Sequence, residues 1–302
     1  MKIISIINLL LALSLAPLFF CVTGKTKNIL AGRKGVSILQ VYFDLYKLFN
    51  KGIVYSRTTG FVFRMAPIII SSAIVIALFI IPIGFSDSII RFDCDLIVFV
   101  YLFALIKYFM VSGALDTGSS FEGMGASREI LFSLFSEITL FIILFVLVVK
   151  TKALSLSVIY GSLENGMWMR DLPSMILLIV ALFIVFLVEN SRVPIDDPNT
   201  HLELTMIHEV MILDNSGVDL GLILYTSAIK YFIFCALIIS FIPFRFNNLI
   251  LNEALFFAGI FLLSIFVGFF ESAIARARFK KVPRLIILAA AFSILALILV
   301  MR

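Results

Sequence analysis

Four long stretches of this chain carry no charged residue, and they constrain the fold more than any other feature. They are Ile3 to Gly24, Met65 to Phe85, Pro173 to Val188 and Leu285 to Met301. A helix of about 20 apolar residues crosses the roughly 30 Å hydrocarbon core of a bilayer. Only 14% of the residues are charged and 62% are hydrophobic, whereas soluble domains carry about 25% charged residues. The sequence therefore predicts an all-α, polytopic integral membrane protein.

Eight apolar segments are long enough to cross a membrane as helices. The predicted spans cover about residues 3–24, 65–85, 96–113, 129–149, 172–189, 220–244, 254–272 and 283–301. No internal repeat or soluble segment separates them, so we predict a single transmembrane domain over residues 1–302. The first segment follows a lone Lys2 and could be a signal peptide, but it is longer than the usual apolar region of one and lacks a small-residue cleavage site. We therefore interpret it as an uncleaved span.

The distribution of lysine and arginine predicts the orientation of these spans. The first, third, fifth and seventh loops hold 14 basic residues, and the opposite side, termini included, holds 7. Because basic loops stay in the cytoplasm, these four loops are predicted to be cytoplasmic and both termini to lie outside it. The expected location is the cell inner (cytoplasmic) membrane. The net charge of +5 follows from this bias, so it is no argument for nucleic-acid binding.

The first cytoplasmic loop contains a segment with helical periodicity. Between Ser37 and Phe49, the apolar residues Ile38, Val41, Leu45 and Leu48 recur at the spacing of one helix face. This pattern predicts an amphipathic helix lying in the membrane interface. The pattern alone does not distinguish a binding role from that of a linker helix that covers the bundle.

Three charged residues fall in the interior of predicted spans, away from the span ends, where charges are costly. They are Lys107, Glu137 and Lys230. Each costs about 2.5–3.5 kcal/mol at the centre of a helix on insertion scales, so each is expected to face the interior of the bundle. For the two lysines, an ion relay and a structural ion pair or snorkelling side chain are equally compatible with the sequence. Glu137 has a short side chain in mid-span, and this favours a relay.

The fifth loop is acidic although its side of the membrane is basic. Between Glu189 and Asp219 lie seven acidic residues and one arginine, Arg192. The same loop holds both histidines of the chain, His201 and His208. On a helix these two would be about 10.5 Å apart, which is too far to bind one zinc ion at about 2.0–2.1 Å. We predict no metal site and no catalytic nucleophile here, which leaves a proton-collecting funnel or a docking surface.

Cysteine usage excludes a redox centre built by this chain alone. Cys21, Cys94 and Cys235 are scattered and form no C-x-x-C pair. An iron–sulfur cluster or a structural zinc ion needs several such ligands close together. We therefore predict no cofactor in this chain and expect any redox centre to belong to a partner.

Three motifs together resemble one family. They are GRKGVSILQVYFDLYKLFNKG at 32–52, SGALDTGSSFEGMGASRE at 112–129 and VENSRVPIDDPNTHLELTMIHEVMILDNSG at 188–217. The chain resembles the membrane subunit shared by energy-converting nickel–iron hydrogenases, formate hydrogenlyase (the subunit 4 type) and respiratory complex I (the subunit 1 or H type). The second and third motifs are more similar to the hydrogenase branch. The resemblance covers most of the chain, including the number and orientation of the spans.

The resemblance implies a subunit without catalysis of its own. A peripheral iron–sulfur subunit and a hydrogenase-type large subunit with a nickel–iron centre would sit on the cytoplasmic loops, and antiporter-like membrane subunits would lie beside the chain. Acidic residues of this chain would then couple electron transfer to proton or sodium movement. The candidate ion relay comprises Lys107, Glu137, Glu189, Glu203, Glu209, Asp214 and Lys230. The candidate docking and loop residues are Arg33, Lys34, Asp44, Asp116, Arg128, Glu129, Arg192, Asp196, His201 and His208.

Three other functions stay open on the sequence. The chain could house quinone in a complex I-type oxidoreductase, between the interfacial helix and the acidic loop. It could also be a passive membrane anchor for a hydrogenase arm. A stand-alone transporter is disfavoured because the chain lacks an internal repeat and carries a large acidic loop.

Overall fold

The computed structural model describes residues 2–84, 86–163, 171–196, 206–242, 248–277 and 279–301. Its α-helices are α1 (Lys2–Leu30), α2 (Gln40–Phe49), α3 (Phe61–Ile80), α4 (Asp95–Asp116), α5 (Ser120–Thr151), α6 (Leu156–Ser162), α8 (Leu172–Glu189), α9 (Gly217–Ser240), α10 (Leu249–Ala273) and α11 (Val282–Met301). Two 3-10 turns, η1 (Glu209–Ile212) and η2 (Phe279–Lys281), complete the described elements. Within these residues there is no strand, and 8 helices are long and apolar enough to cross a membrane. The all-α class and the predicted number of spans are confirmed.

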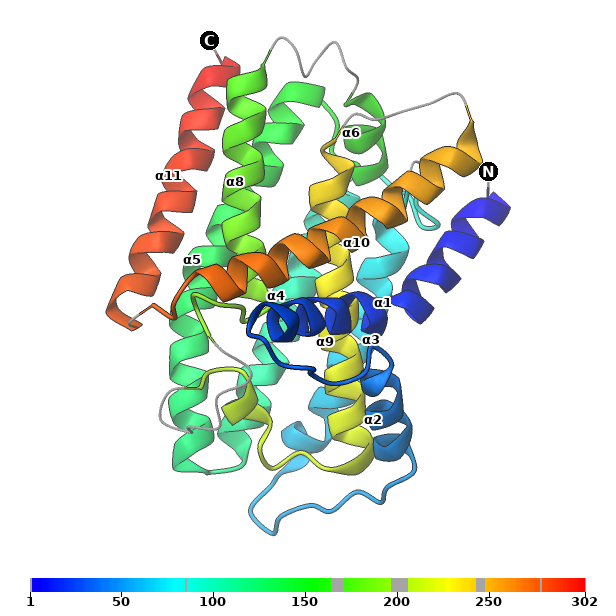
Figure 1. Cartoon of the computed structure of the whole chain (residues 1–302). Helices are drawn as coiled ribbons and strands as arrows, with labels where there is room; N and C mark the ends of the chain where they lie inside the picture. Colours follow the sequence, from blue (N-terminus) through cyan, green and yellow to red (C-terminus); the bar gives the residue numbers. More distant parts are fainter. Residues whose placement is uncertain are drawn as a thin grey trace.

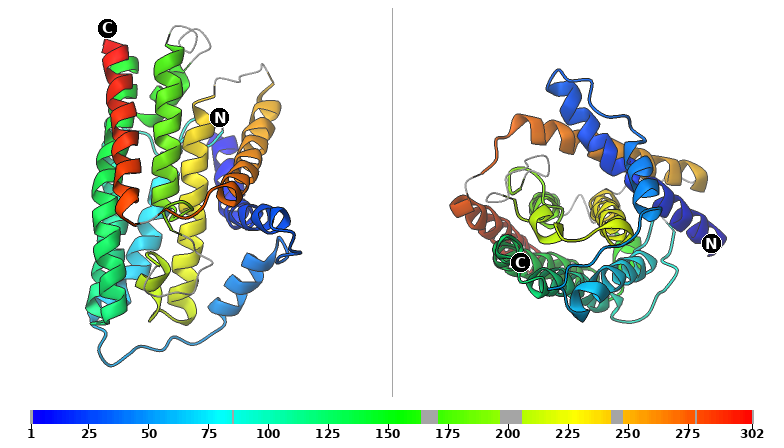
Figure 2. Two further views of the ribbon diagram at one scale, coloured as in Figure 1. Left: turned by 60° about the vertical axis from the view of Figure 1, so that its left-hand side comes forward. Right: turned by 90° about the horizontal axis from the view of Figure 1, so that it is seen from below.

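The spans form a bundle with two oblique helices on one side. Helix α3 packs against α4, α11 packs against α8 and α5, and α1 packs against α10 and α9. Helices α1 and α10 cross the more upright helices at an angle (Figures 1 and 2). The start of α1 and the end of α11 lie at the same end of the bundle, as an even number of spans requires, and α2 lies toward the other end (Figure 1).

Helix α1 changes direction along its length (Figure 1), and Pro17 explains why. Proline has no N–H to donate, so the carbonyl of Leu13 loses its helical partner. The Tyr225 hydroxyl of α9 donates to that carbonyl at 3.0 Å, and the Tyr42 hydroxyl of α2 donates to the next carbonyl, that of Ser14. Because a freed backbone group in a membrane needs a partner, these two tyrosines fix α1 against α9 and α2.

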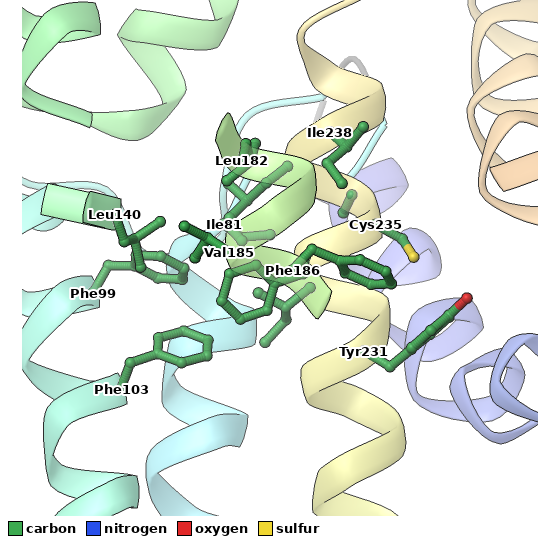
Figure 3. Close-up of a cluster of buried hydrophobic side chains, with 14 of the residues drawn as sticks. Ile81, Phe99, Phe103, Leu140, Leu182, Val185, Phe186, Tyr231, Cys235 and Ile238 are labelled. Atoms are coloured by element: carbon green, nitrogen blue, oxygen red, sulfur yellow. The ribbon is translucent and has the colours of Figure 1, made fainter. Parts of the chain in front are cut away.

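Aromatic side chains fill the space between α4, α8 and α9 (Figure 3). The rings of Phe99 and Phe103 lie 4.9 Å apart, and Phe103 contacts Phe234 edge-on at 5.3 Å. Phe186 of α8 packs against Tyr231 of α9 at 5.2 Å. Such tilted and edge-on contacts are the favoured geometries for aromatic pairs, and they hold the helices that carry the charged residues described below.

Several span ends differ from the prediction. Helix α1 continues to Leu30 rather than ending near residue 24, and α10 begins at Leu249 rather than near residue 254. Helix α3 ends at Ile80 rather than near residue 85, because Ile81 is extended (φ −75°, ψ 137°) and the residue before a proline avoids the helical region. Helix α5 begins at Ser120 rather than near residue 129. Its first turns carry Glu122, Arg128 and Glu129, and hydropathy does not identify such charged turns as part of a span.

The predicted interfacial helix is present and slightly shorter. Helix α2 covers Gln40–Phe49 instead of 37–49. Of its predicted apolar face, Leu45 is buried and Val41 and Leu48 are half-buried, whereas Ile38 precedes the helix and is 44% exposed. The face that contacts the bundle is therefore formed by the later residues of the pattern.

Gly217, at the start of α9, packs against the loop between α2 and α3, and its replacement should destabilise the protein. Gly217 has φ +54°, and a Cβ atom there would meet the carbonyl oxygen of Gly52. We expect Gly217→Ala to cost about 1–3 kcal/mol of stability and to lower the thermal unfolding midpoint of the detergent-purified protein. Gly123→Ala is the matched control, because nothing lies within 4 Å of its added Cβ. Equal midpoints for the two variants would contradict this account.

Candidate functional site

A buried ion cluster joins three helices inside the bundle. The Lys107 Nζ atom of α4 lies 2.8 Å from Glu189 Oε1 of α8 and 3.4 Å from Glu129 Oε1 of α5. The Ser136 hydroxyl donates to the same Glu189 oxygen at 2.7 Å. The three charged residues are between 2% and 8% exposed. An unpaired charge in this position would be costly, so the fold depends on these contacts.

Two further charged residues, Glu137 and Lys230, interact electrostatically with the cluster. Glu137 follows Ser136 on α5, is half-buried and lies within electrostatic reach of Lys107, Glu189 and Glu129. Lys230 of α9 interacts electrostatically with Glu189 but forms no ion pair with a described residue. The sequence left the roles of the two lysines open. Lys107 forms a buried ion pair, whereas Lys230 faces a cavity.

That cavity has a volume of about 440 Å³ and lies on the α2 side of the bundle, between the end of α8, the loop before α9 and the first half of α9. Its titratable lining residues are Glu189, Arg192, Asp196, His208, Glu209 and Lys230. Its apolar lining residues are Phe20, Met206, Ile212, Leu213, Leu220 and Leu224. All six titratable residues belong to the sets singled out from the sequence. Glu189 belongs to both the ion cluster and the cavity wall, so it connects the two.

His208 is held neutral at the cavity wall. Burial, and then the positive charges of Lys230 and Lys107, lower the pKa of His208 to about 3. Its Nε2 atom lies 3.5 Å from the Ser227 hydroxyl. A neutral ring can donate and accept one hydrogen bond, so it suits a hydrogen-bonded chain better than a fixed cation would.

Arg192 is clamped between helices. Its guanidinium carbon lies 4.3 Å from the ring centre of Phe20 and 5.2 Å from that of Tyr231. Its Nη1 atom lies 3.4 Å from Glu271 Oε1, and the second oxygen of Glu271 lies 3.8 Å from Lys27 Nζ. Arg192 is 3% exposed. The sequence placed Arg192 among the candidate docking and loop residues, and its observed contacts join α1, α9, α10 and the segment after α8.

Two acidic residues organise the loops between spans through backbone hydrogen bonds. Asp196 accepts from Ile207 N at 2.9 Å and from His208 N at 3.3 Å, and it pairs with Arg276 at 2.9 Å. Asp116 accepts from Gly60 N and Phe63 N at 2.9 and 3.0 Å, at the start of α3. Carboxylates bonded in this way satisfy N–H groups that would otherwise lack partners. Asp196 also holds the backbone of His208 in position at the cavity wall.

The remaining predicted residues lie apart from the cavity. Arg33, Lys34, Asp44 and Asp214 are exposed. Arg128 stacks on the Phe279 ring at 4.7 Å and donates to Met206 O at 3.2 Å, so it holds the backbone of the loop before α9. His201 and Glu203 lie outside the described residues.

Among the residues that the structure describes, no group of three or more histidine, cysteine, aspartate or glutamate side chains is arranged to hold a metal ion. Because His201 is not among them, the absence of a metal site stays a prediction.

Sequence reasoning missed three buried carboxylates. Glu271 pairs with Arg192. Glu122 accepts from Asp214 N at 3.0 Å. Asp95 accepts from the Ser155 hydroxyl and from Leu156 N, both at 2.7 Å. All three lie in the terminal turns of spans, where a charge is inexpensive and so gives no signal in a hydropathy pattern.

Comparison with known proteins identifies the family of this chain. The family model described as NADH dehydrogenase matches residues 2–301. The chain belongs to this family. Hydrogenase-4 component C of Escherichia coli (strain K12) is 30% identical over 88% of this chain and 85% of its own length. Formate hydrogenlyase subunit 4 of the same organism is 26% identical, covering 97% of this chain and 96% of its own. The resemblance found in the three sequence motifs is thereby confirmed.

One solved structure contains a chain whose fold is similar to that of this protein. It is the membrane-bound sulfane sulfur reductase, described as an archaeal respiratory membrane complex. One of its chains matches with a TM-score of 0.82 at 20% identity, covering 97% of this chain and 98% of that chain. At this identity the similarity shows the shared fold of a multi-pass membrane protein.

The ion cluster can be tested by a double-mutant cycle. Removing one partner of a buried pair leaves an uncompensated charge and typically costs about 3–5 kcal/mol. We expect Lys107→Met to be strongly destabilising and the double variant Lys107→Met/Glu189→Gln to recover part of that loss, measured by thermal unfolding of the detergent-purified protein. Additive losses in the double variant would show that the two side chains are not coupled.

Because the pKa of His208 is low, its imidazole ring should stay neutral and show no titration near neutral pH. A folded-state pKa of about 3 lies below the value in an unfolded chain, about 6.5. The unfolded state therefore binds an extra proton between these values, and this residue's contribution to stability falls as the pH drops through that window. In ¹⁵N-histidine-labelled His201→Gln protein, the remaining ring signal should not titrate between pH 5 and 8. A midpoint in that range would refute the assignment, and the His208→Gln variant identifies the signal of His201.

Proposed function

We propose that this chain is the membrane-arm subunit of a multisubunit, redox-driven ion-translocating complex of the formate hydrogenlyase or energy-converting nickel–iron hydrogenase type. In this role it docks the peripheral electron-transfer arm and supplies acidic residues that couple electron transfer to the movement of protons or sodium ions. The observation that carries the proposal is the position of Glu189. One of its oxygens contacts Lys107 and Ser136 inside the bundle, and the residue also lines the cavity.

The described residues support a stepwise path for a proton. Glu209 and His208 line the cavity together with Glu189 and Lys230. From Glu189, the contacts lead through Lys107 to Glu129, and Glu137 lies within electrostatic reach of all three. Charged groups inside a membrane domain are rare and mark ion pathways. Glu203 and Asp214 would extend the path toward the cytoplasm as collecting groups.

The partners follow from the names of the relatives. Two similar proteins are a hydrogenase component and a formate hydrogenlyase subunit, so we expect a peripheral iron–sulfur subunit, a large subunit with a nickel–iron centre and neighbouring antiporter-like subunits. The cofactors would belong to those partners, since the three cysteines here are free and far apart in sequence. The complex would reside in the inner membrane, with both termini of this chain outside the cytoplasm.

A second candidate function rests on the same cavity. A volume of about 440 Å³ with a mixed apolar and polar lining is typical of small-molecule sites, so the chain could house quinone in a complex I-type enzyme. A passive anchor would need neither the cavity nor the buried ion cluster. Complex purification and ion-uptake measurements distinguish the three possibilities.

The composition of the complex tests the proposed assembly. An affinity-tagged chain purified from native membranes in mild detergent should carry a nickel–iron large subunit and iron–sulfur subunits, identified by mass spectrometry. An NADH-oxidising module or stoichiometric bound quinone would instead support the second function. Purification of the chain without any redox partner would overturn the proposal.

The relay predicts that Glu137→Gln uncouples the complex. Glutamine preserves size but cannot take up a proton, and we expect ion uptake per electron to fall about tenfold or more, measured in inverted vesicles during hydrogen evolution from reduced viologen. Asp171→Asn is the matched control, because its partner is Lys150 at 3.1 Å, away from the path. Unchanged uptake in Glu137→Gln would contradict the relay. Turnover without uptake in the unaltered complex would indicate a passive anchor.

A further inference from the structure

Helix α2 has three faces with different surroundings. One face contacts the bundle: Leu45 is 7% exposed, Leu48 and Phe49 lie beside Gly221 of α9, and the Tyr42 hydroxyl donates to the Ser14 carbonyl of α1. These contacts fix the rotation of α2 about its own axis. The directions in which its other two faces point are therefore determined as well.

The second face is polar. The Gln40 side chain donates to Asp44 Oδ1 at 2.9 Å, one helical turn along, and Lys47 follows Asp44 by three residues on the same side of the helix. Asp44 and Lys47 are exposed. This face suits contact with water, and Asp44 is the sole acidic residue in the first cytoplasmic loop between Lys25 and Arg64.

The third face is apolar and open. Leu39, at the N-terminal cap, and Phe43 and Tyr46 are 52%, 56% and 71% exposed. Their spacing of four and three residues places them in one stripe, roughly 100° around the helix from the polar stripe. The preceding Val36 is also 56% exposed. A linker helix that only covered the bundle would need a single apolar face, whereas α2 has a second apolar stripe directed away from the bundle.

Exposed cations flank this stripe in the sequence. Arg33, Lys34, Lys47 and Lys51 are exposed, and none of the four forms an ion pair with a described residue. Lys47 follows Phe43 by one turn, at the border between the polar and apolar faces. Apolar side chains flanked by unpaired cations fit an anionic membrane surface, because acyl chains cover the first and phosphates neutralise the second.

We propose that the outer face of α2 binds anionic phospholipid, with Leu39, Phe43 and Tyr46 against the acyl chains and with Lys47, Arg33 and Lys34 holding the phosphate. Position and charge favour lipid over the peripheral arm as the partner of this face. Helix α2 is tethered between the ends of two spans, α1 and α3, and the local excess of basic residues complements an anionic headgroup. This binding does not depend on the proposed relay or on the identity of the redox partner.

The test uses the full complex in nanodiscs that contain phosphatidylcholine with increasing fractions of phosphatidylglycerol. Native mass spectrometry counts the retained anionic lipids. We expect the apparent affinity for phosphatidylglycerol to fall about fivefold for each cation removed in Lys47→Gln and Lys34→Gln/Lys47→Gln, and to weaken at high salt. Lys281→Gln, an exposed lysine in another cytoplasmic loop, is the matched control. Equal retention in all variants would overturn the proposal.

A second measurement identifies what covers the apolar stripe. A photoreactive residue placed at Phe43, which is exposed and so tolerant of replacement, should cross-link to phospholipid in native membranes. Cross-linking mainly to a protein would show that this face is a docking surface for another subunit and would overturn the lipid assignment.

Discussion

The ion pair between Lys107 and Glu189 is the interaction on which this membrane domain depends. A lysine and two glutamates taken out of water inside a bilayer protein need one another, and here they come from three helices, α4, α5 and α8. Their distances of 2.8 and 3.4 Å set the relative positions of these helices. The rings of Phe99, Phe103 and Phe234 pack between α4 and α9. The charged side chains of the ion cluster are paired with one another.

The same pair holds Glu189 at the boundary between the bundle and the cavity. Because Glu189 is the last residue of α8, it lies where the bundle meets the loop before α9 and the cavity. Asp196 holds the backbone of that loop at Ile207 and His208, and Arg192 holds the chain between α1 and α10 through Glu271. Structural charges therefore surround the charges proposed to move protons. These contacts hold the cavity wall in position.

Much of this architecture could be predicted from the sequence, and the reason differs between elements. Span number follows from hydropathy, and the start and end of α8 were predicted to the residue because Pro173 and Glu189 mark them. Helix α5 starts earlier than predicted because its charged first turns carry no hydropathy signal. Lys107, Glu137 and Lys230 were singled out as costly charges and Glu189 as part of the acidic loop. The pairing of Lys107 with Glu189 was not predicted, since the two residues are 82 apart in the chain.

The sequence by itself determined the membrane class, the eight spans, the interfacial helix and the family, because composition and local motifs encode these directly. Only the tertiary structure decided which charges meet. It paired Lys107 with Glu189 and Glu129, clamped Arg192 between two aromatic rings and gathered six titratable residues around one cavity. It also left a second apolar stripe of α2 uncovered. The physical reason is that charges in a membrane are satisfied across helices, and those contacts depend on how distant segments pack.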